Sequence, residues 1–214
     1  MWVAGRHRCS GGERLATLLD MVRDHFVLAP DAEVSTEANP ESTWPEFFAT
    51  IRAAGYTRVS LGMQSVAPRV LATLDRVHSP GRAAAAATEA IAEGFTHVNL
   101  DLIYGTPGES DDDLVRSVDA AVQAGVDHVS AYALVVEHGT ALARRVRRGE
   151  LAAPDDDVLA HRYELSMLGC RRPGLPGTRC PIGVDRAASA GTTWVIGTVA
   201  SGGAQVRART ATLA

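Results

Sequence analysis

The segment Glu93-Gly94-Phe95-Thr96-His97-Val98-Asn99-Leu100-Asp101-Leu102 decides the fold class of this sequence. An alanine-rich run precedes Gly94, and glycine commonly ends a helix because it adopts the left-handed conformation without strain. After a short loop, apolar and polar residues alternate, which is typical of a strand with two unlike faces. The segment therefore predicts a helix end, a short loop and the start of a strand.

The same pattern occurs at two other places in the chain. Ala54-Gly55-Tyr56-Thr57-Arg58-Val59-Ser60 comes before it, and Ala124-Gly125-Val126-Asp127-His128-Val129-Ser130 comes after it. A further strand is predicted over Glu33–Asn39. Consecutive units in which a helix leads into a new strand are typical of a parallel sheet. The sequence therefore predicts an α/β fold, either a barrel or a doubly wound sheet.

Start and stop signals predict the helices between these strands. Residues 82–93 are rich in alanine, and the acidic segment 110–113 opens another helix. Acidic side chains in a first turn interact favourably with the helix dipole. Thr43 and Glu46 have the spacing of a capping box, so we expect Thr43 to cap a helix that ends at Gly55.

The predicted strands have one apolar and one polar face. Val98, Leu100 and Leu102 alternate with Asn99 and Asp101, and the other strands alternate in the same way. Parallel strands that are buried on both faces usually consist of continuous apolar runs instead. The apolar set would face outer helices, which leaves a polar inner face that needs a ligand or water.

The longest polar side chains of the inner face lie near the carboxyl ends of their strands, where barrel active sites are found. They are Glu37, Gln64 and Asp101. Either carboxylate alone is compatible with a helix cap or with an ion pair to Arg76. The two together are also compatible with the acid and base of a barrel enzyme. Matching positions on successive strands favour a shared site.

Composition excludes several classes of protein. The chain has 214 residues, 46% of them hydrophobic, and a net charge of −4, which indicates a globular core rather than disorder. No apolar run approaches the roughly 20 residues of a membrane span, and the first residues do not have the pattern of a signal peptide. Cys9, Cys170 and Cys180 form neither a disulfide framework nor a zinc spacing, so we expect a cytoplasmic protein.

Five segments, in order, resemble the radical S-adenosylmethionine (SAM) family of oxygen-independent coproporphyrinogen III oxidase-like proteins. Within that family, the Arg-x-His-Ser segment and the stretch from Tyr132 to Thr140 are more similar to the HemW-type heme chaperones. The resemblance covers about residues 12–168. The five segments are Glu37–Pro40, Ser60–Ser65, Leu74–Ser79, Asn99–Gly108 and Ser130–Leu134.

The resemblance implies an incomplete radical-SAM-type (βα) barrel, with an open parallel sheet and outer helices. It also implies SAM and a [4Fe–4S] cluster as the family's cofactors, and heme or a porphyrin as a partner. A carboxylate accepts hydrogen bonds from ribose hydroxyls, and an arginine pairs with the methionyl carboxylate. The residues that line the SAM site by this resemblance are Glu37, Gln64, Arg76, Asp101 and Val135.

The amino-terminal part departs from the family pattern. The family holds its cluster with Cys-x-x-x-Cys-x-x-Cys, whereas Cys9 stands alone here. We therefore expect the first barrel strand and the cluster loop to be missing from the domain formed by residues 1–168. We also expect this chain to bind no cluster, to be inactive as given, and to have an open sheet with unpaired edge strands.

The tail, residues 169–214, differs in composition and departs from the family as well. It has six arginines and one acidic residue, but it lacks the interleaved aromatic residues of a nucleic-acid-binding arm, so we expect no nucleic-acid partner. Codons that encode Gly177–Gly183 also allow the family's Tyr-Glu-Val-Ser-Asn-Trp in a shifted frame. Gly191–Gly197 allows the family's His-Asn-x-x-Tyr-Trp in that same frame. We therefore predict an irregular tail that is translated out of frame.

Overall fold

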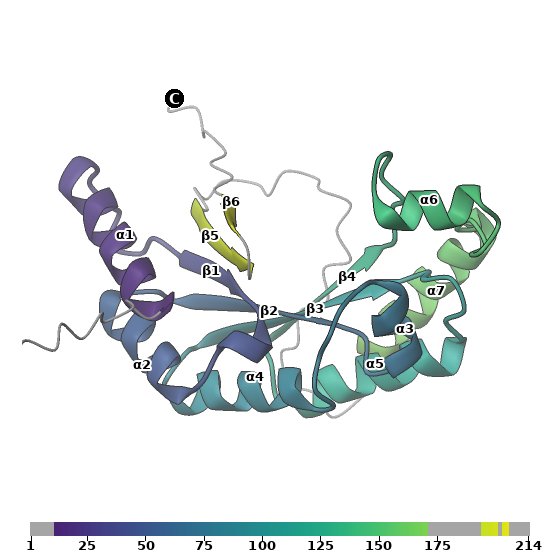
Figure 1. The fold of residues 1–214 in the computed structure, drawn as a ribbon. Coiled ribbons are helices and arrows are strands. Elements are labelled where there is room, and N and C mark those ends of the chain that lie inside the picture. Colours follow the sequence, from purple (N-terminus) through teal and green to yellow (C-terminus); the bar gives the residue numbers. More distant parts are fainter. Residues whose placement is uncertain (1–10, 171–193, 201–202, 206–214) are drawn as a thin grey trace, which may run out of the picture.

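The computed structural model describes residues 11–170, 194–200 and 203–205 (Figure 1). Helices and strands alternate along most of this length. The elements are α1 (Gly11–His25), β1 (Val34–Ala38), the short 3₁₀ helix η1 (Pro40–Ser42), α2 (Pro45–Ala54), β2 (Arg58–Gln64), α3 (Pro68–Thr73), α4 (Arg82–Ala92), β3 (His97–Tyr104), α5 (Asp111–Gln123), β4 (His128–Ala133), α6 (Ala141–Arg147), α7 (Asp156–Cys170), β5 (Trp194–Ala200) and β6 (Gly203–Gln205).

One sheet contains all of the described strands, in the order β4-β3-β2-β1-β5-β6. Strands β1 to β4 are parallel neighbours in chain order, which confirms the predicted parallel sheet. β5 pairs parallel with β1, and β6 pairs antiparallel with β5. The expectation of an unpaired edge is therefore wrong for β1, whose outer backbone groups bond to β5.

The tail prediction is corrected in part by the same pairing. Residues 194–200 and 203–205 form strands, so an irregular structure is wrong for those two segments. The rest of residues 171–214 lies outside the described residues. The domain boundary near residue 168 and the out-of-frame origin of the tail stay predictions.

The core lies between the sheet and the helices α2, α4 and α5, which Figure 1 shows along one face of the sheet. On β2, the buried residues Val59, Leu61 and Met63 alternate with less buried ones. On β3, Leu100 and Leu102 are fully buried and belong to the same core. The predicted apolar face of the strands is thus confirmed.

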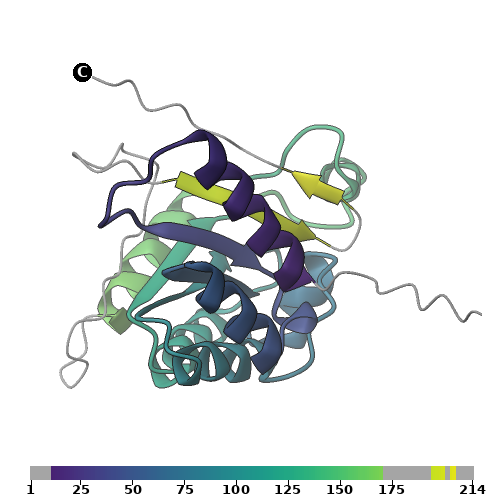
Figure 2. The ribbon, with the colours of Figure 1, turned by 90° about the vertical axis from the view of Figure 1, so that its left-hand side faces the viewer.

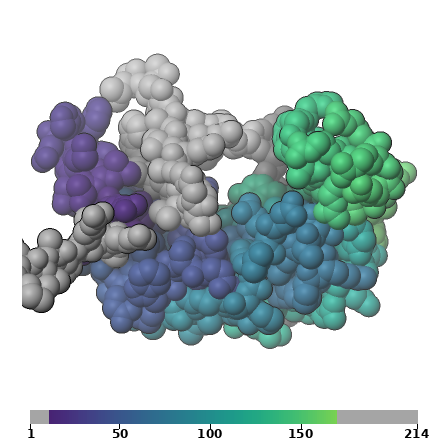
Figure 3. Space-filling model, in the orientation of Figure 1, coloured from purple at the N-terminus to yellow at the C-terminus, as the bar shows by residue number. Residues whose placement is uncertain are grey.

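Helices α1, α6 and α7 lie towards the two ends of the sheet. α1 packs along α2 (Figure 2), and the Tyr56 hydroxyl donates a 3.0 Å hydrogen bond to the carbonyl of Leu15 in α1. At the other end α7 packs on α5, while α6 stands out from the body of the molecule (Figure 3). The carboxyl ends of β1 to β4 remain the edge from which the connecting loops leave.

Helix termini agree with the sequence at most positions. Gly55 has φ = 107° and ends α2, as predicted, and Ser110 forms a capping box with Asp113 at the start of α5. The predicted cap of α2 is wrong. Trp44 holds the cap position, and the Thr43 hydroxyl donates instead to the carbonyl of Pro40, within the turn of η1.

A buried ion pair docks α7 on the loop that follows β3. The Arg162 and Glu109 side chains are 9% and 1% exposed, and Nη1 of Arg162 lies 3.2 Å from Oε2 of Glu109. Gly105 donates its N–H to the same Oε2 at 2.7 Å. Close to the end of α7, a Cβ on Gly169 would lie 2.7 Å from Val118, so the helices approach closely there.

We expect Arg162→Met to lower the free energy of unfolding by about 3 kcal/mol at neutral pH, because it leaves a buried carboxylate without its cation. Burial already raises the pKa of Glu109. Adding Glu109→Gln should restore part of the loss, and Arg147→Met, on an exposed side chain, should change little. Urea unfolding measures the free energy of unfolding of the parent, the two single variants and the double variant. An Arg162→Met protein as stable as the parent would contradict the docking role of this pair.

Candidate functional site

A cluster of polar side chains lies on the inner face of the sheet, across β2, β3 and β4. The Ser60 hydroxyl donates to Oδ2 of Asp101 at 2.8 Å. Nδ2 of Asn99 lies 2.6 Å from Oγ of Ser60 and 2.7 Å from Oδ1 of Asp101. The Ser130 hydroxyl donates to Oδ1 of Asn99 at 3.2 Å. Three adjacent strands therefore share one hydrogen-bonded network centred on a carboxylate.

Glu37 lies on the same face as this network. It pairs in register with Ser60 on the neighbouring strand, and its side chain is exposed while the other residues of β1 are buried. Burial raises the pKa of Asp101, and the negative charge of Glu37 raises it further. Ser60 and Asn99 act in the opposite direction, because their hydrogen bonds favour the ionised carboxylate.

Gln64 ends β2 in a strained conformation. Its φ is 57°, in the left-handed region that residues other than glycine rarely adopt. The register between β2 and β3 shifts between Gly62 and Gln64. A Cβ on Gly62 would lie 2.5 Å from Nε2 of Gln64, so the amide folds back over the glycine that pairs with Asp101. Its buried Oε1 has no hydrogen-bond partner among the described residues.

Hydrogen bonds to α5 hold the loop that follows Gln64. The hydroxyls of Ser65 and Ser117 lie 3.1 Å apart, and the N–H of Val66 donates to Ser117 at 3.1 Å. Both serines are buried. This loop is therefore fixed to the helix layer, which stabilises the strained end of β2.

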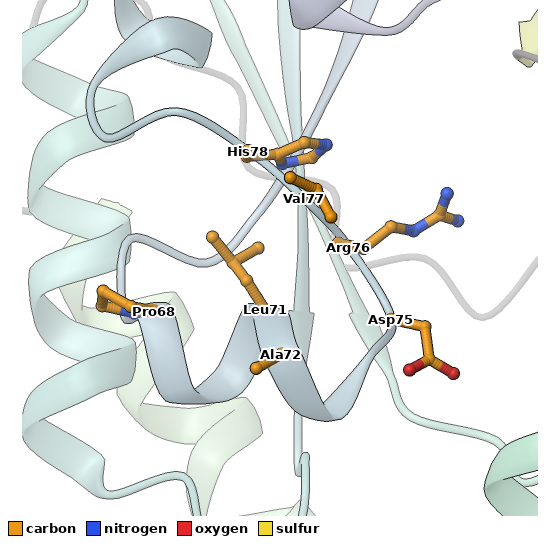
Figure 4. Close-up of a pocket in the computed structure, with 7 residues that line it drawn as sticks. All are labelled: Pro68, Leu71, Ala72, Asp75, Arg76, Val77 and His78. Atoms are coloured by element: carbon orange, nitrogen blue, oxygen red, sulfur yellow. The ribbon is translucent and has the colours of Figure 1, made fainter.

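Arg76 follows α3 in a segment next to a shallow hollow of about 450 Å³. Figure 4 shows the side chains of Asp75 and Arg76 pointing away from that of Leu71. Asp75 also has a left-handed backbone, with φ = 52°. Glu41 accepts hydrogen bonds from the N–H of Ser79 at 2.5 Å and from its hydroxyl at 3.2 Å. The Arg76 segment is thereby tied to the turn after β1.

The structure brings three of the five predicted site residues to one face of the sheet: Glu37, Gln64 and Asp101. Arg76 and Val135 are exposed and lie on segments that follow the sheet's carboxyl edge, Val135 being two residues beyond β4. An ion pair from Arg76 to either carboxylate, one reading of the sequence, is not among the interactions of residues 11–169.

Sequence analysis missed the network around Asp101 and the bond between Glu41 and Ser79. The alternation on β3 does place Asn99 on the polar face, two residues before Asp101. Asn99 bonds to side chains of both neighbouring strands. These bonds depend on the register of the strands, which the alternation alone does not predict. Cys9 and Cys180, which bear on the cluster prediction, lie outside the described residues, as does the side chain of Cys170.

Comparison with known proteins gives a family match. A family model described as the radical SAM superfamily matches residues 5–121. The chain is 36% identical over 153 residues to the heme chaperone HemW of Escherichia coli, covering 72% of this chain and 39% of that protein. It is 35% identical over 150 residues to the mitochondrial radical S-adenosyl methionine domain-containing protein 1 of Mus musculus, covering 70% and 34%. The chain thus spans less than half the length of these relatives.

Solved structures agree on the fold. Coproporphyrinogen III oxidase (HemN) from Escherichia coli, a radical SAM enzyme, gives a TM-score of 0.64 at 23% identity, over 74% of this chain and 37% of that one. The archaeal Elp3 of Methanocaldococcus infernus gives 0.63 at 20% identity, over 85% and 45%. The fold is an α/β arrangement of the radical-SAM-type (βα) barrel with an open sheet, as predicted.

The two carboxylates on the inner face make a prediction that needs no ligand. Glu37→Gln removes a negative charge, so the pKa of Asp101 should fall. Carboxyl-carbon NMR titration measures the shift. Glu33→Gln is the control, because Glu33 pairs with Arg58 at 3.0 Å, at the start of the strands, and should leave Asp101 unchanged. An Asp101 pKa that does not respond to Glu37→Gln would contradict their placement on one face.

Proposed function

The chain belongs to the radical SAM superfamily, and we propose that it is the SAM-binding part of a HemW-type protein related to oxygen-independent coproporphyrinogen III oxidase. The observation that supports this most is the pair of carboxylates on the inner face, where Ser60 and Asn99 bond to Asp101 and Ser130 bonds to Asn99. Carboxylates at the carboxyl edge of a barrel sheet suit the hydroxyls of a nucleoside.

Each proposed site residue has a role that its chemistry supports. Asp101 and Glu37 accept hydrogen bonds from the hydroxyls and ammonium group of SAM. Arg76 pairs with the methionyl carboxylate, as guanidinium groups do. Gln64 offers an amide with an unused oxygen, and Val135 offers exposed apolar surface beyond β4.

Backbone strain also supports a ligand site here. Gln64 and Asp75 are the two non-glycine residues with positive φ in the part of the chain that the structure describes. Such residues cost of order 1–3 kcal/mol each and cluster at ligand sites. A buried amide oxygen without a partner is a further cost that a bound donor would remove. These groups fit SAM.

The residues do not fit the family's cluster. Three thiolates in Cys-x-x-x-Cys-x-x-Cys leave one iron of a [4Fe–4S] cluster open, and no such spacing exists among Cys9, Cys170 and Cys180. Within the described residues, no three His, Cys, Asp or Glu side chains gather as a metal site. The proposal therefore includes binding of SAM by this chain and excludes its reductive cleavage.

Heme or a porphyrin is the proposed partner, because the bacterial relatives in Escherichia coli and Bacillus subtilis are heme chaperones. The alternative of an unrelated barrel enzyme with Glu37 and Asp101 as acid and base is not favoured, because the family match covers both residues. Among the described helices, none is long and apolar enough to cross a bilayer. We propose that the protein is cytoplasmic and that it has no nucleic-acid partner.

S-Adenosylhomocysteine, which lacks the reactive methyl group, is the probe for SAM binding. We expect the chain to bind it, and Asp101→Ala to bind about tenfold more weakly, because hydrogen bonds to a charged group contribute roughly 1.5–3 kcal/mol. Isothermal titration calorimetry measures both. Asp24→Ala, at the end of α1, is the control and should bind as the parent does. A parent chain without measurable affinity would refute the proposed site.

Reconstitution with iron and sulfide tests the cluster separately. We expect no [4Fe–4S] absorbance and no 5′-deoxyadenosine from SAM under reducing conditions, because one isolated thiolate does not replace three. Full-length Escherichia coli HemW, treated in parallel, controls for the reconstitution itself. A stable cluster with reductive SAM cleavage in this chain would overturn this part of the proposal.

A further inference from the structure

We infer that Asn99 is a positioning residue: with Ser60 and Ser130 it forms a hydrogen-bond relay that orients the Asp101 carboxylate and keeps it an acceptor for the ligand's hydroxyls. This inference rests on the proposed SAM site and assigns a part of that site that does not itself touch the ligand. The relay is defined here as Ser60, Asn99 and Ser130.

The direction of every proton in the relay follows from its geometry. The ionised Asp101 carboxylate only accepts hydrogen bonds, so the Asn99 amino group faces it and Oδ1 faces Ser130, which donates at 3.2 Å. The Asn99 amino group then donates both to Ser60 at 2.6 Å and to Asp101 at 2.7 Å. Ser60 has one proton and already accepts from Asn99, so it donates that proton to Asp101. Two donors, Ser60 and Asn99, therefore point to the carboxylate, and Ser130 holds the amide that supplies one of them.

The carboxylate needs this support. Burial and the charge of Glu37 on β1 both disfavour its ionised form. Ser60 on β2 and Ser130 on β4 face it and are neutral, and the titratable groups on that face of β4 are His128 and Tyr132. No cation is paired with Asp101 among the described residues. Among the described residues, the relay therefore supplies the hydrogen bonds that favour the ionised form of Asp101.

The relay also limits what Asp101 can bind. One hydrogen bond is donated to each of its oxygens, Ser60 to Oδ2 and Asn99 to Oδ1. Each oxygen keeps a remaining lone pair, so the group presents two adjacent acceptors and no donor. Two adjacent hydroxyls, as in a ribose, match that arrangement. A site built to pair a hydroxyl discriminates strongly against a ligand that lacks it.

Burial distinguishes the relay from ordinary surface polarity. Asn99 is 4% exposed and Ser130 is 8% exposed, on the face opposite the helix layer. A buried amide requires hydrogen-bond partners. Among the described residues, the Asn99 amide bonds to Ser60, Ser130 and Asp101. Loss of a purely structural amide would affect stability alone, whereas loss of the Asn99 amide should also change the pKa of Asp101.

The test compares the parent chain with Asn99→Leu, Ser60→Ala and Ser130→Ala, and with Ser166→Ala as the control. Ser166 is fully buried in α7, and its hydroxyl donates within that helix to the Arg162 carbonyl, far from Asp101 in the sequence, so we expect its loss to affect stability alone. The first readout is the Asp101 pKa by carboxyl-carbon NMR, without ligand. The second is the affinity for S-adenosylhomocysteine and for its 3′-deoxy analogue as a function of pH.

We expect the Asp101 pKa to rise in Asn99→Leu and Ser60→Ala, and less in Ser130→Ala, because donors that favour the ionised form are lost. We expect binding to require the ionised form of Asp101. As the pH is lowered, the affinity of Asn99→Leu for the ligand should therefore begin to fall at a higher pH than that of the parent. At neutral pH, affinity should be about tenfold lower, with less preference for the ligand that has both hydroxyls. Ser166→Ala should match the parent.

The outcomes separate the relay from the proposed function. An Asp101 pKa and a pH profile unchanged in folded Asn99→Leu and Ser60→Ala would overturn the relay while leaving SAM binding intact. If the parent binds no nucleoside, the proposed function fails, and the NMR titration alone still decides whether the relay controls Asp101. Should Asn99→Leu fail to fold, Ser60→Ala gives the same readouts, and an unchanged pKa there would overturn the relay.

Discussion

The two-residue period of the parallel strands is the constraint on which the rest of this structure depends. Each strand must bury one set of side chains against the helix layer, and Val59, Leu61 and Leu100 are fully buried for that reason. The alternate set then lies on the opposite face, whatever its polarity. Polar groups placed there by adjacent strands satisfy one another, and two carboxylates are brought to one surface.

Backbone strain at the carboxyl edge of the sheet supports a ligand site on the inner face. Left-handed backbone at Gln64 and Asp75 is held in place by loops that bond to α5 and to Glu41. Costs of this kind persist where the surrounding structure fixes them, and they are typical of ligand sites. The family match is the basis for the ligand class that we propose, and the hydrogen bonds around Asp101 give a physical reason why that carboxylate suits it.

The parallel direction of β1 to β4 could be predicted from the helices between successive strands. Their faces could be predicted because burial decides which residues meet those helices. The placement of Glu37 and Asp101 on one face follows from the same period. The cap at Trp44 could not be predicted, because the Thr43 hydroxyl bonds to the Pro40 carbonyl within η1 and does not cap α2. The pairing of β5 with β1 and the docking of Arg162 on Glu109 depend on contacts between segments far apart in sequence, which local patterns do not specify.

A crystal structure of this chain with S-adenosylhomocysteine tests most directly whether the inner face of the sheet is a nucleoside site. We predict the ribose hydroxyls within hydrogen-bond distance of the Asp101 carboxylate, with Asn99 bonded to that carboxylate and not to the ligand. A ligand bound on the helix face, or Glu37 and Asp101 on opposite faces of the sheet, would contradict the assignment of the site.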